Sequence, residues 1–445
     1  MLEANGQNAQ VLRACAAVLA PLLLTAACSA PGFGGSPAPV LKIGVDLPLS
    51  GAEGRVATPA LNGVRLYFQQ HPTLDGFAVN LVVKDDSLNG TAEAPLGAAN
   101  VQALAADPQV MAVIGPFDSS VARAEIPVAN QASLAMVSPA TSSPCLTKPD
   151  YVPAALSPSH VAVSCKDAGL PAPADLRPSG VNNYFRLATT DDLQGPAAAD
   201  YAARTLHLLR VATISDHEAY GQALAGSFAT RFRALGGSIV GRLDLDPSTT
   251  VDATPFLVRM KADGVQAVYF GGITANKGCV IRAEMAGVFA PGEATPFLGG
   301  DGIADDPACT QDAGLNAAGI YATVPIVDTS NVGSAEPVIA AFRAAFPDPR
   351  DYGAYTVIAY DAAAVVYDAL DRAIKATDGK APPRGNVISQ LSVTHDFDGS
   401  IGVFGFDANG DSTRRVITVY EPQPSDPRGP WRRVGSVDYT SALPY

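Results

Sequence analysis

Residues 40–68, VLKIGVDLPLSGAEGRVATPALNGVRLYF, contain the pattern that decides the fold. The first eight, 40–47, are largely apolar and rich in β-branched residues, which predicts a strand. Thr58 and Pro59 then offer an N-cap and a proline for the first helical turn. The apolar positions of the helix that follows share one face: Leu61, Val64 and Phe68. Residues 78–84, AVNLVVK, predict the next strand, so the chain begins as a β-α-β unit.

Strand and helix patterns alternate along the rest of the chain in two series. Further strands are expected at residues 110–114, 132–137, 209–214, 238–245 and 265–270, and helices near 219–235 and 355–375. Alternation of this kind predicts parallel sheets covered by helices. We therefore expect an α/β protein of two doubly wound, Rossmann-like lobes, with a ligand at the carboxyl ends of strands. Residues 144–182, rich in Pro and Ser, separate the two series as a surface loop.

The composition excludes several classes of protein. The chain has 445 residues, 47% of them hydrophobic and 16% charged, which suits a folded protein and argues against disorder. Its 30 Lys and Arg against 43 Asp and Glu give a formal net charge of −13, so its field repels polyanions and no nucleic-acid partner is expected.

The N-terminus carries an export pattern. Residues 14–27, ACAAVLAPLLLTAA, form an apolar run of signal-peptide length that is too short to span a bilayer. Residues 24–28, LTAAC, resemble the bacterial lipobox, in which the cysteine is lipidated and becomes the new N-terminus. Cys28 is then the anchor, the alternative being a structural cysteine after an ordinary cleavage site. We expect residues 28–39 to be a flexible Gly/Ser/Pro tether, and membrane contact through the lipid alone.

Beyond Cys15 and Cys28 of the export pattern, the sequence has an even number of cysteines: Cys145, Cys165, Cys279 and Cys309. In an exported protein this favours two disulfides. All three pairings are open, and we prefer the two sequential ones because each closes a short loop worth about 3 kcal/mol. Zinc binding is the less favoured alternative, since no C-x-x-C pair is present.

No catalytic or cofactor motif is evident. The sequence lacks H-E-x-x-H and G-x-S-x-G, and its five histidines have no metal-like spacing. The segment FDANGD, residues 406–411, departs from a calcium-binding EF-hand loop and is interpreted as a hairpin-type turn. We therefore predict no enzyme activity, no metal and no cofactor.

Several segments together resemble the leucine/isoleucine/valine-binding proteins of ABC transporters. They are IGVDLPLSGAEGRVATPALNG (43–63), VIGPFDSSV (113–121), VSPATS (137–142), DHEAYG (216–221), LGGDG (298–302), AYDA (359–362) and FDANG (406–410). The resemblance covers nearly all of residues 40–420. It implies a type I periplasmic binding fold, two α/β lobes joined by three crossovers, which closes on a small ligand and delivers it to a transporter permease.

The resemblance also implies a division of the chain and a location. Residues 1–27 are the signal peptide and 28–39 the lipidated cysteine and tether; lobe 1 comprises 40–187 plus 325–402, and lobe 2 comprises 188–324 plus 403–445. The protein is expected to be exported and held by its lipid on the outer face of the cytoplasmic membrane.

The family's ligand residues can be carried over to matching positions. Ser119 and the segment Ala140, Thr141 and Ser142 are expected to hold the carboxylate of an amino acid. Tyr220 and Asp301 are expected to contact it from the second lobe, with Asp301 holding the ammonium, since both charges need partners when they lose water. The alternatives are turn or cap roles for Ser119, Ser142 and Asp301, and core packing for Tyr220.

Four positions depart from the family pattern and leave the ligand open. Val56, Ile273 and Thr274 stand where aromatic residues are common, and Asp118 adds a negative charge next to Ser119. A branched-chain amino acid is the first expectation. Other amino acids, amides, short peptides and aromatic acids are alternatives, as is a sensor or receptor role for the same fold.

Overall fold

A computed structural model describes residues 38–151, 165–166, 169–246, 252–289, 295–423 and 431–441. The predicted signal peptide, Cys28 and most of the tether lie outside the described residues. Among the helices that are described, none combines the length and the apolarity needed to cross a bilayer.

The first sheet has six strands in the order β2-β3-β1-β6-β7-β8. Their bounds are β1 Val40–Leu47, β2 Thr73–Leu74, β3 Phe77–Asp85, β6 Val110–Ile114, β7 Ala135–Ser138 and β8 Tyr184–Arg186. All neighbours are parallel except β2 and β3. Side chains alternate between the two faces of a strand, and every residue of β6 and β7 is buried, so the central strands are covered on both faces. A short hairpin, β4 Ser87–Leu88 with β5 Thr91–Ala92, follows β3.

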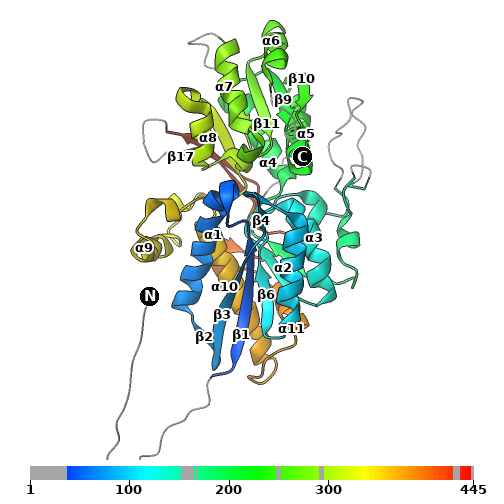
Figure 1. The fold of residues 1–445 in the computed structure, drawn as a ribbon, viewed down its shortest axis with the longest axis vertical. Coiled ribbons are helices and arrows are strands. Elements are labelled where there is room, and N and C mark those ends of the chain that lie inside the picture. Colours follow the sequence, from blue (N-terminus) through cyan, green and yellow to red (C-terminus); the bar gives the residue numbers. More distant parts are fainter. Residues whose placement is uncertain are drawn as a thin grey trace, which may run out of the picture. The chain divides into compact units, whose positions relative to one another are not determined.

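Helices cover both faces of this sheet (Figure 1). The helices of one face are α1 Gly51–Gln70, α10 Thr356–Lys375 and α11 Arg384–Ser392; those of the other are α2 Ala94–Ala106 and α3 Ser119–Gln131. Ile43 and Val45 pack into the first core, whereas Val113 and Met136 pack against α2 and α3 in the second.

The second sheet has seven strands in the order β10-β9-β11-β12-β13-β16-β17. Their bounds are β9 Arg210–Ser215, β10 Ser238–Asp244, β11 Ala267–Gly271, β12 Phe297–Gly299, β13 Ile320–Val324, β16 Val416–Pro422 and β17 Trp431–Asp438. The strands from β10 to β13 are parallel, and β16 and β17 are antiparallel additions. The other helices are α4 Asp191–Asp200, α5 Ala219–Ala234, α6 Thr254–Ala262, α7 Gly278–Val288, α8 Pro307–Ala313 and α9 Glu336–Ala345, and β14 Phe397–Gly399 pairs with β15 Gly402–Phe404.

The chain passes between the two sheets three times, and the three passages are hydrogen-bonded to one another. The Thr189 amide donates to the Pro325 carbonyl at 2.8 Å, and its hydroxyl donates to the Val416 carbonyl at 3.1 Å. The Thr418 hydroxyl donates to the Ile326 carbonyl at 2.8 Å. The predicted fold of two doubly wound lobes with three crossovers is confirmed; the residue boundaries of the lobes stay a prediction.

The predicted start of the first helix is wrong. Helix α1 begins at Gly51, so Thr58 and Pro59 lie inside it. The amides of Ala52 and Glu53 donate to the Gly90 carbonyl at 3.1 and 3.4 Å, and this distant partner satisfies the first turn in place of a Thr58 cap.

Both preferred disulfides are confirmed. Cys145 pairs with Cys165 and Cys279 with Cys309, with Cα atoms 5.8 and 5.0 Å apart. Residues 406–411 form the predicted turn, in which the Asp407 carboxylate accepts the amides of Asn409 at 2.9 Å and Asp411 at 3.0 Å.

Candidate functional site

The residues predicted to bind a ligand follow the carboxyl ends of parallel strands. Ser119 is the first residue of α3 after β6, and residues 140–142 follow β7. Tyr220 lies in the first turn of α5 after β9, and Asp301 follows β12. Parallel strands place such segments at one edge of each sheet, which is where α/β folds bind ligands.

Asp301 accepts hydrogen bonds from three side chains. Tyr220 Oη and Gln194 Nε2 each donate to its Oδ1 at 2.8 Å, and Tyr355 Oη donates to its Oδ2 at 2.6 Å. We call these four residues the Asp301 cluster. The structure thus brings together two of the predicted residues, Tyr220 and Asp301, and adds two that the sequence reasoning missed.

Both phenols of the Asp301 cluster are fixed as donors. Burial, followed by the nearby Asp301 charge, holds the pKa of Tyr220 and of Tyr355 well above the ordinary value for a phenol. Tyr220 Oη also accepts the Gly302 amide at 3.2 Å, which fixes the segment after β12. Because a carboxylate oxygen has two lone pairs, Asp301 can still accept a further donor such as an ammonium group.

The two missed residues connect the Asp301 cluster to the predicted serine segments. The ring of Tyr355, just before α10, lies edge-on to Phe117 at 4.8 Å between centroids, and Phe117 is close in sequence to Ser119. Gln194 belongs to α4, whose first residue, Asp191, donates its amide to the Ser142 carbonyl at 2.9 Å. The available sequence signal for Gln194 was an amide side chain next to an apolar helical run, LQGPAAA. Tyr355 belongs to none of the sequence motifs quoted above.

The predicted carboxylate donors have partners within the protein. The Ala140 amide donates to Ser138 Oγ at 3.2 Å, and the Thr141 hydroxyl is hydrogen-bonded to that of Tyr184. Ser119 Oγ accepts the Ser143 amide at 3.2 Å, which leaves its hydroxyl proton available for another acceptor. Ser142 is buried, with 3% of its surface exposed. Their contact with a ligand stays a prediction.

A family model described as "Periplasmic binding protein" matches residues 40–426. The chain belongs to this family of extracytoplasmic solute-binding proteins. Its members are binding proteins rather than enzymes.

Two curated relatives illustrate the similarity. A leucine-, isoleucine-, valine-, threonine- and alanine-binding protein of Pseudomonas aeruginosa is 28% identical over 243 residues, 54% of this chain and 61% of the relative. A Leu/Ile/Val-binding protein homologue of Brucella abortus is 25% identical over 404 residues, 88% of this chain and 93% of the relative. The match to the first relative therefore spans less than two thirds of that protein's length.

Solved structures share the fold at lower identity. A leucine-binding protein of Thermotoga maritima has a TM-score of 0.71 and 22% identity, covering 89% of this chain and 98% of the other. A solute-binding protein of an R. palustris ABC transporter, in complex with 4-hydroxybenzoate, has a TM-score of 0.70 and 16% identity, covering 89% and 97%. The fold is therefore that of type I periplasmic binding proteins.

The surroundings of Asp301 in this periplasmic binding protein are acidic. Burial, and then the charge of Asp301, raises the pKa of Asp191 to about 8. Burial also raises the pKa of Asp118 well above its ordinary value, and the charges of Glu53, Asp86 and Asp301 add to the effect. Asp118 Oδ2 is buried and receives no hydrogen bond from the described residues. These neighbours favour a ligand that brings a positive group to Asp301.

Val56, Ile273 and Thr274 stand where the family commonly has aromatic residues, and each makes other contacts in this chain. The Ile273 amide donates to Asp216 Oδ2 at 3.1 Å, and the Thr274 hydroxyl donates to the Gly302 carbonyl at 3.3 Å. Val56 is a partly buried residue of α1 that packs on the apolar core. Thr274 thus braces the segment that carries Asp301, and Ile273 is bonded to the segment after β9.

Proposed function

We propose that this chain is a lipid-anchored solute-binding protein that captures an α-amino acid, of the branched-chain type in the first instance, for an ABC transporter permease. The observation that carries the proposal is the Asp301 cluster, a carboxylate held by three donors and surrounded by acidic neighbours. Such a carboxylate suits the ammonium of a zwitterion, because an ion that loses its water needs a charged partner.

The other half of a zwitterion needs donors. The Ser119 hydroxyl, with residues Ala140, Thr141 and Ser142, is proposed to bind the ligand carboxylate. Asp301 follows a strand of the second sheet, and its partner Tyr355 precedes α10, which packs on the first sheet. A ligand that adds contacts to both sides stabilises the closed state by its differential affinity.

An aromatic acid is the second candidate ligand class, because the R. palustris neighbour is in complex with 4-hydroxybenzoate. The acidic surroundings of Asp301 argue against it, since a benzoate brings a negative charge and no ammonium. Amides, short peptides and a sensor role in place of transport are the remaining alternatives from the sequence.

The export and anchoring part of the proposal rests on the N-terminal sequence. The LTAAC motif at residues 24–28 and the Gly-, Ser- and Pro-rich sequence after it suit a lipidated cysteine and a tether. We expect a Cys28→Ser chain expressed in a bacterium to leave the membrane fraction, whereas a Cys15→Ser chain stays in it. Equal membrane association of both variants would refute the anchor.

A thermal-shift screen tests the ligand class. Amino acids, amides, short peptides and aromatic acids are added to the purified protein, and a ligand at 100 times its dissociation constant should add about 2.7 kcal/mol of stability. Stabilisation by branched-chain amino acids that is lost in Asp301→Asn and retained in Asp378→Asn, a control at an exposed aspartate, would support the proposal. Stabilisation by aromatic acids alone would overturn it.

A further inference from the structure

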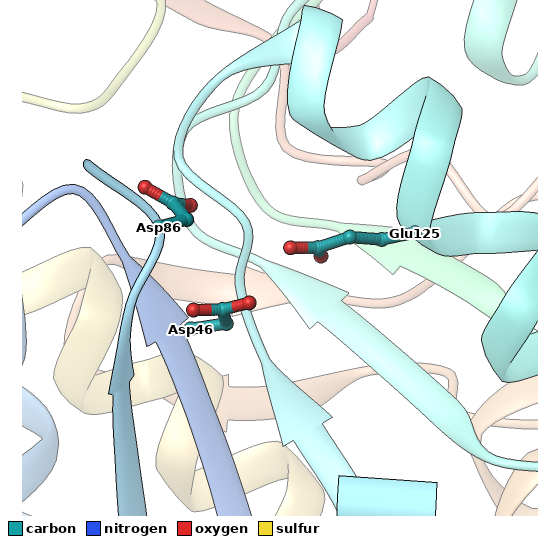
Figure 2. Close-up of side chains that lie close together, drawn as sticks. All are labelled: Asp46, Asp86 and Glu125. Carbon is teal, nitrogen blue, oxygen red and sulfur yellow. The ribbon is translucent and has the colours of Figure 1, made fainter. Parts of the chain in front are cut away.

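Three carboxylates outside the Asp301 cluster converge in the first lobe. Asp46 belongs to β1, Asp86 follows β3 directly, and Glu125 lies on α3. Each offers a carboxylate oxygen within 4.8 Å of the other two. Figure 2 shows the Glu125 side chain reaching from its helix toward the two aspartates. We call these residues the carboxylate triad.

The carboxylate triad is fully buried and almost without donors. All three residues are 0% exposed. Asn100 Nδ2 donates to Asp46 Oδ1 at 3.0 Å, and the carboxyl groups of Asp46 and Glu125 are hydrogen-bonded to each other, but among the described residues none outside the triad donates to Asp86 or to Glu125. Within the described ranges, no lysine or arginine forms an ion pair with any member of the triad.

Elsewhere the fold compensates a buried acid in full. Asp411, 3% exposed, forms an ion pair with Arg186 at 2.7 Å and accepts the Thr147 hydroxyl at 3.1 Å. Burying an ionised carboxylate without such partners costs several kcal/mol. The triad therefore lacks a positive partner that the fold supplies to another buried acid.

The packing around Glu125 leaves room for its carboxylate. Gly97 of α2 faces α3, and a Cβ at this position would lie 2.6 Å from Glu125 Oε1. The same Cβ would lie still closer to Val121 Cγ1, so glycine at position 97 lets α2 pack closely on α3 and leaves the Glu125 carboxylate in place. Two features thus mark the site: buried oxygens without donors from outside the triad, and a glycine beside one of them.

We propose that the carboxylate triad binds one hard divalent cation of the calcium, magnesium or manganese class. Carboxylate oxygens are the ligands these ions prefer, whereas zinc and copper sites generally include nitrogen or sulfur ligands. A pair of oxygens on one such ion lies at most about 5 Å apart, given metal–oxygen distances of about 2.0–2.6 Å. The limit of 4.8 Å within the triad suits that geometry.

The cation would connect three elements that the chain brings together from distant positions. It would join β1, the segment after β3 and α3, whose first residue is Ser119. The site is separate from the solute site, because none of its residues belongs to the Asp301 cluster. Its expected role is to stabilise the lobe that carries the predicted carboxylate donors.

Cation titration of the full chain tests the proposal. The protein is stripped with EDTA, and calcium, magnesium and manganese chlorides are titrated in turn, with thermal unfolding and calorimetry as the readouts. We expect one of the ions to raise Tm along a saturable curve with one ion bound per chain. Absence of stoichiometric binding by all three ions would overturn the proposal and leave protons shared within the triad as the source of compensation.

Matched variants locate the bound ion. Glu125→Gln keeps the shape of the side chain but removes a charged ligand, so we expect its cation affinity to fall by at least about tenfold. Asp361→Asn alters another buried carboxylate of this lobe and should keep the wild-type affinity. If Glu125→Gln fails to fold, Asp46→Asn takes its place; unchanged affinity in the folded triad variant would overturn the assignment to these residues.

Discussion

The Asp301 cluster and the carboxylate triad are two acidic sites that the same fold treats in opposite ways. Asp301 follows β12, and Asp46 and Asp86 lie at the carboxyl ends of β1 and β3. In the first, one carboxylate accepts from two phenols and an amide; in the second, three carboxylates share one amide donor. This difference indicates that the number of donors around an acid, rather than its burial alone, shows whether the protein supplies all of its partners.

Asp411 is a buried acid with a charged partner, Arg186. Removing this partner should lower the stability of the protein more than any other substitution considered. Arg186→Ala leaves Asp411 buried without its cation and should lower the free energy of unfolding by about 3–5 kcal/mol in urea titration. Arg433→Ala, which breaks a more exposed pair with Asp328 at 3.5 Å, should cost no more than about 1 kcal/mol. Similar losses in the two variants would contradict the distinction.

Asp361 is an intermediate case, with two amide donors and no ion pair to a lysine or arginine of the described residues. The Ser400 and Ile401 amides donate to it at 2.9 and 2.8 Å, yet burial raises its pKa to about 6. The folded state therefore binds this proton more tightly than the unfolded state, and its stability falls as pH rises from about 4 to about 6. At about 1.4 kcal/mol per pH unit, the loss is about 3 kcal/mol.

Asp361→Asn removes this titration and provides the measurement. The difference in unfolding free energy between wild type and variant should favour the wild type by about 3 kcal/mol more at pH 4 than at pH 7.5. A difference that does not change with pH would contradict the raised pKa.

Removing a charge should have opposite effects at the two acidic sites. Asp301→Asn places an amide NH₂ group opposite a phenol that donates to Asp301, either Tyr220 or Tyr355. Two donors then face each other, so the variant should be less stable by about 1–3 kcal/mol. In EDTA, Glu125→Gln removes one of three crowded acids and keeps a hydrogen-bond donor beside Asp46, so it should stabilise the protein. If urea titrations give changes in unfolding free energy of the same sign for both variants, the comparison is contradicted.

The smallest effect is expected from a single donor. Tyr355→Phe removes one of the three donors to Asp301 and should cost about 0.5–1.5 kcal/mol. Tyr360→Phe, in the first turns of α10, removes a more exposed hydrogen bond to Gln70 and should cost less. A larger loss in Tyr360→Phe would show that the Asp301 cluster adds nothing beyond an ordinary surface contact.

Local patterns predicted much of the fold. The strand at residues 110–114 was exact because five apolar residues end at Gly115 and Pro116, and the disulfides followed from an even cysteine count and loop length. The start of α1 was missed because its capping carbonyl, at Gly90, is distant in sequence.

The candidate sites were predicted less completely for the same reason. Tyr220 and Asp301 were each named as ligand contacts from the family resemblance, but the hydrogen bond between them was not predicted. Tyr355 and the carboxylate triad depend on tertiary packing between distant segments. A signal for the triad was present in Asp46, a charged residue inside an apolar strand, but its partners lie on other elements.

Calorimetric titration of L-leucine and of 4-hydroxybenzoate into the full chain and into Asp301→Asn tests most directly whether Asp301 makes this an amino-acid receptor. We predict that leucine binds the wild type with one site per chain and that Asp301→Asn weakens this binding by about 2–5 kcal/mol. We also predict that 4-hydroxybenzoate shows no binding to the wild type. Leucine binding of equal affinity in both chains, or binding of 4-hydroxybenzoate alone, would show that Asp301 does not select an ammonium group.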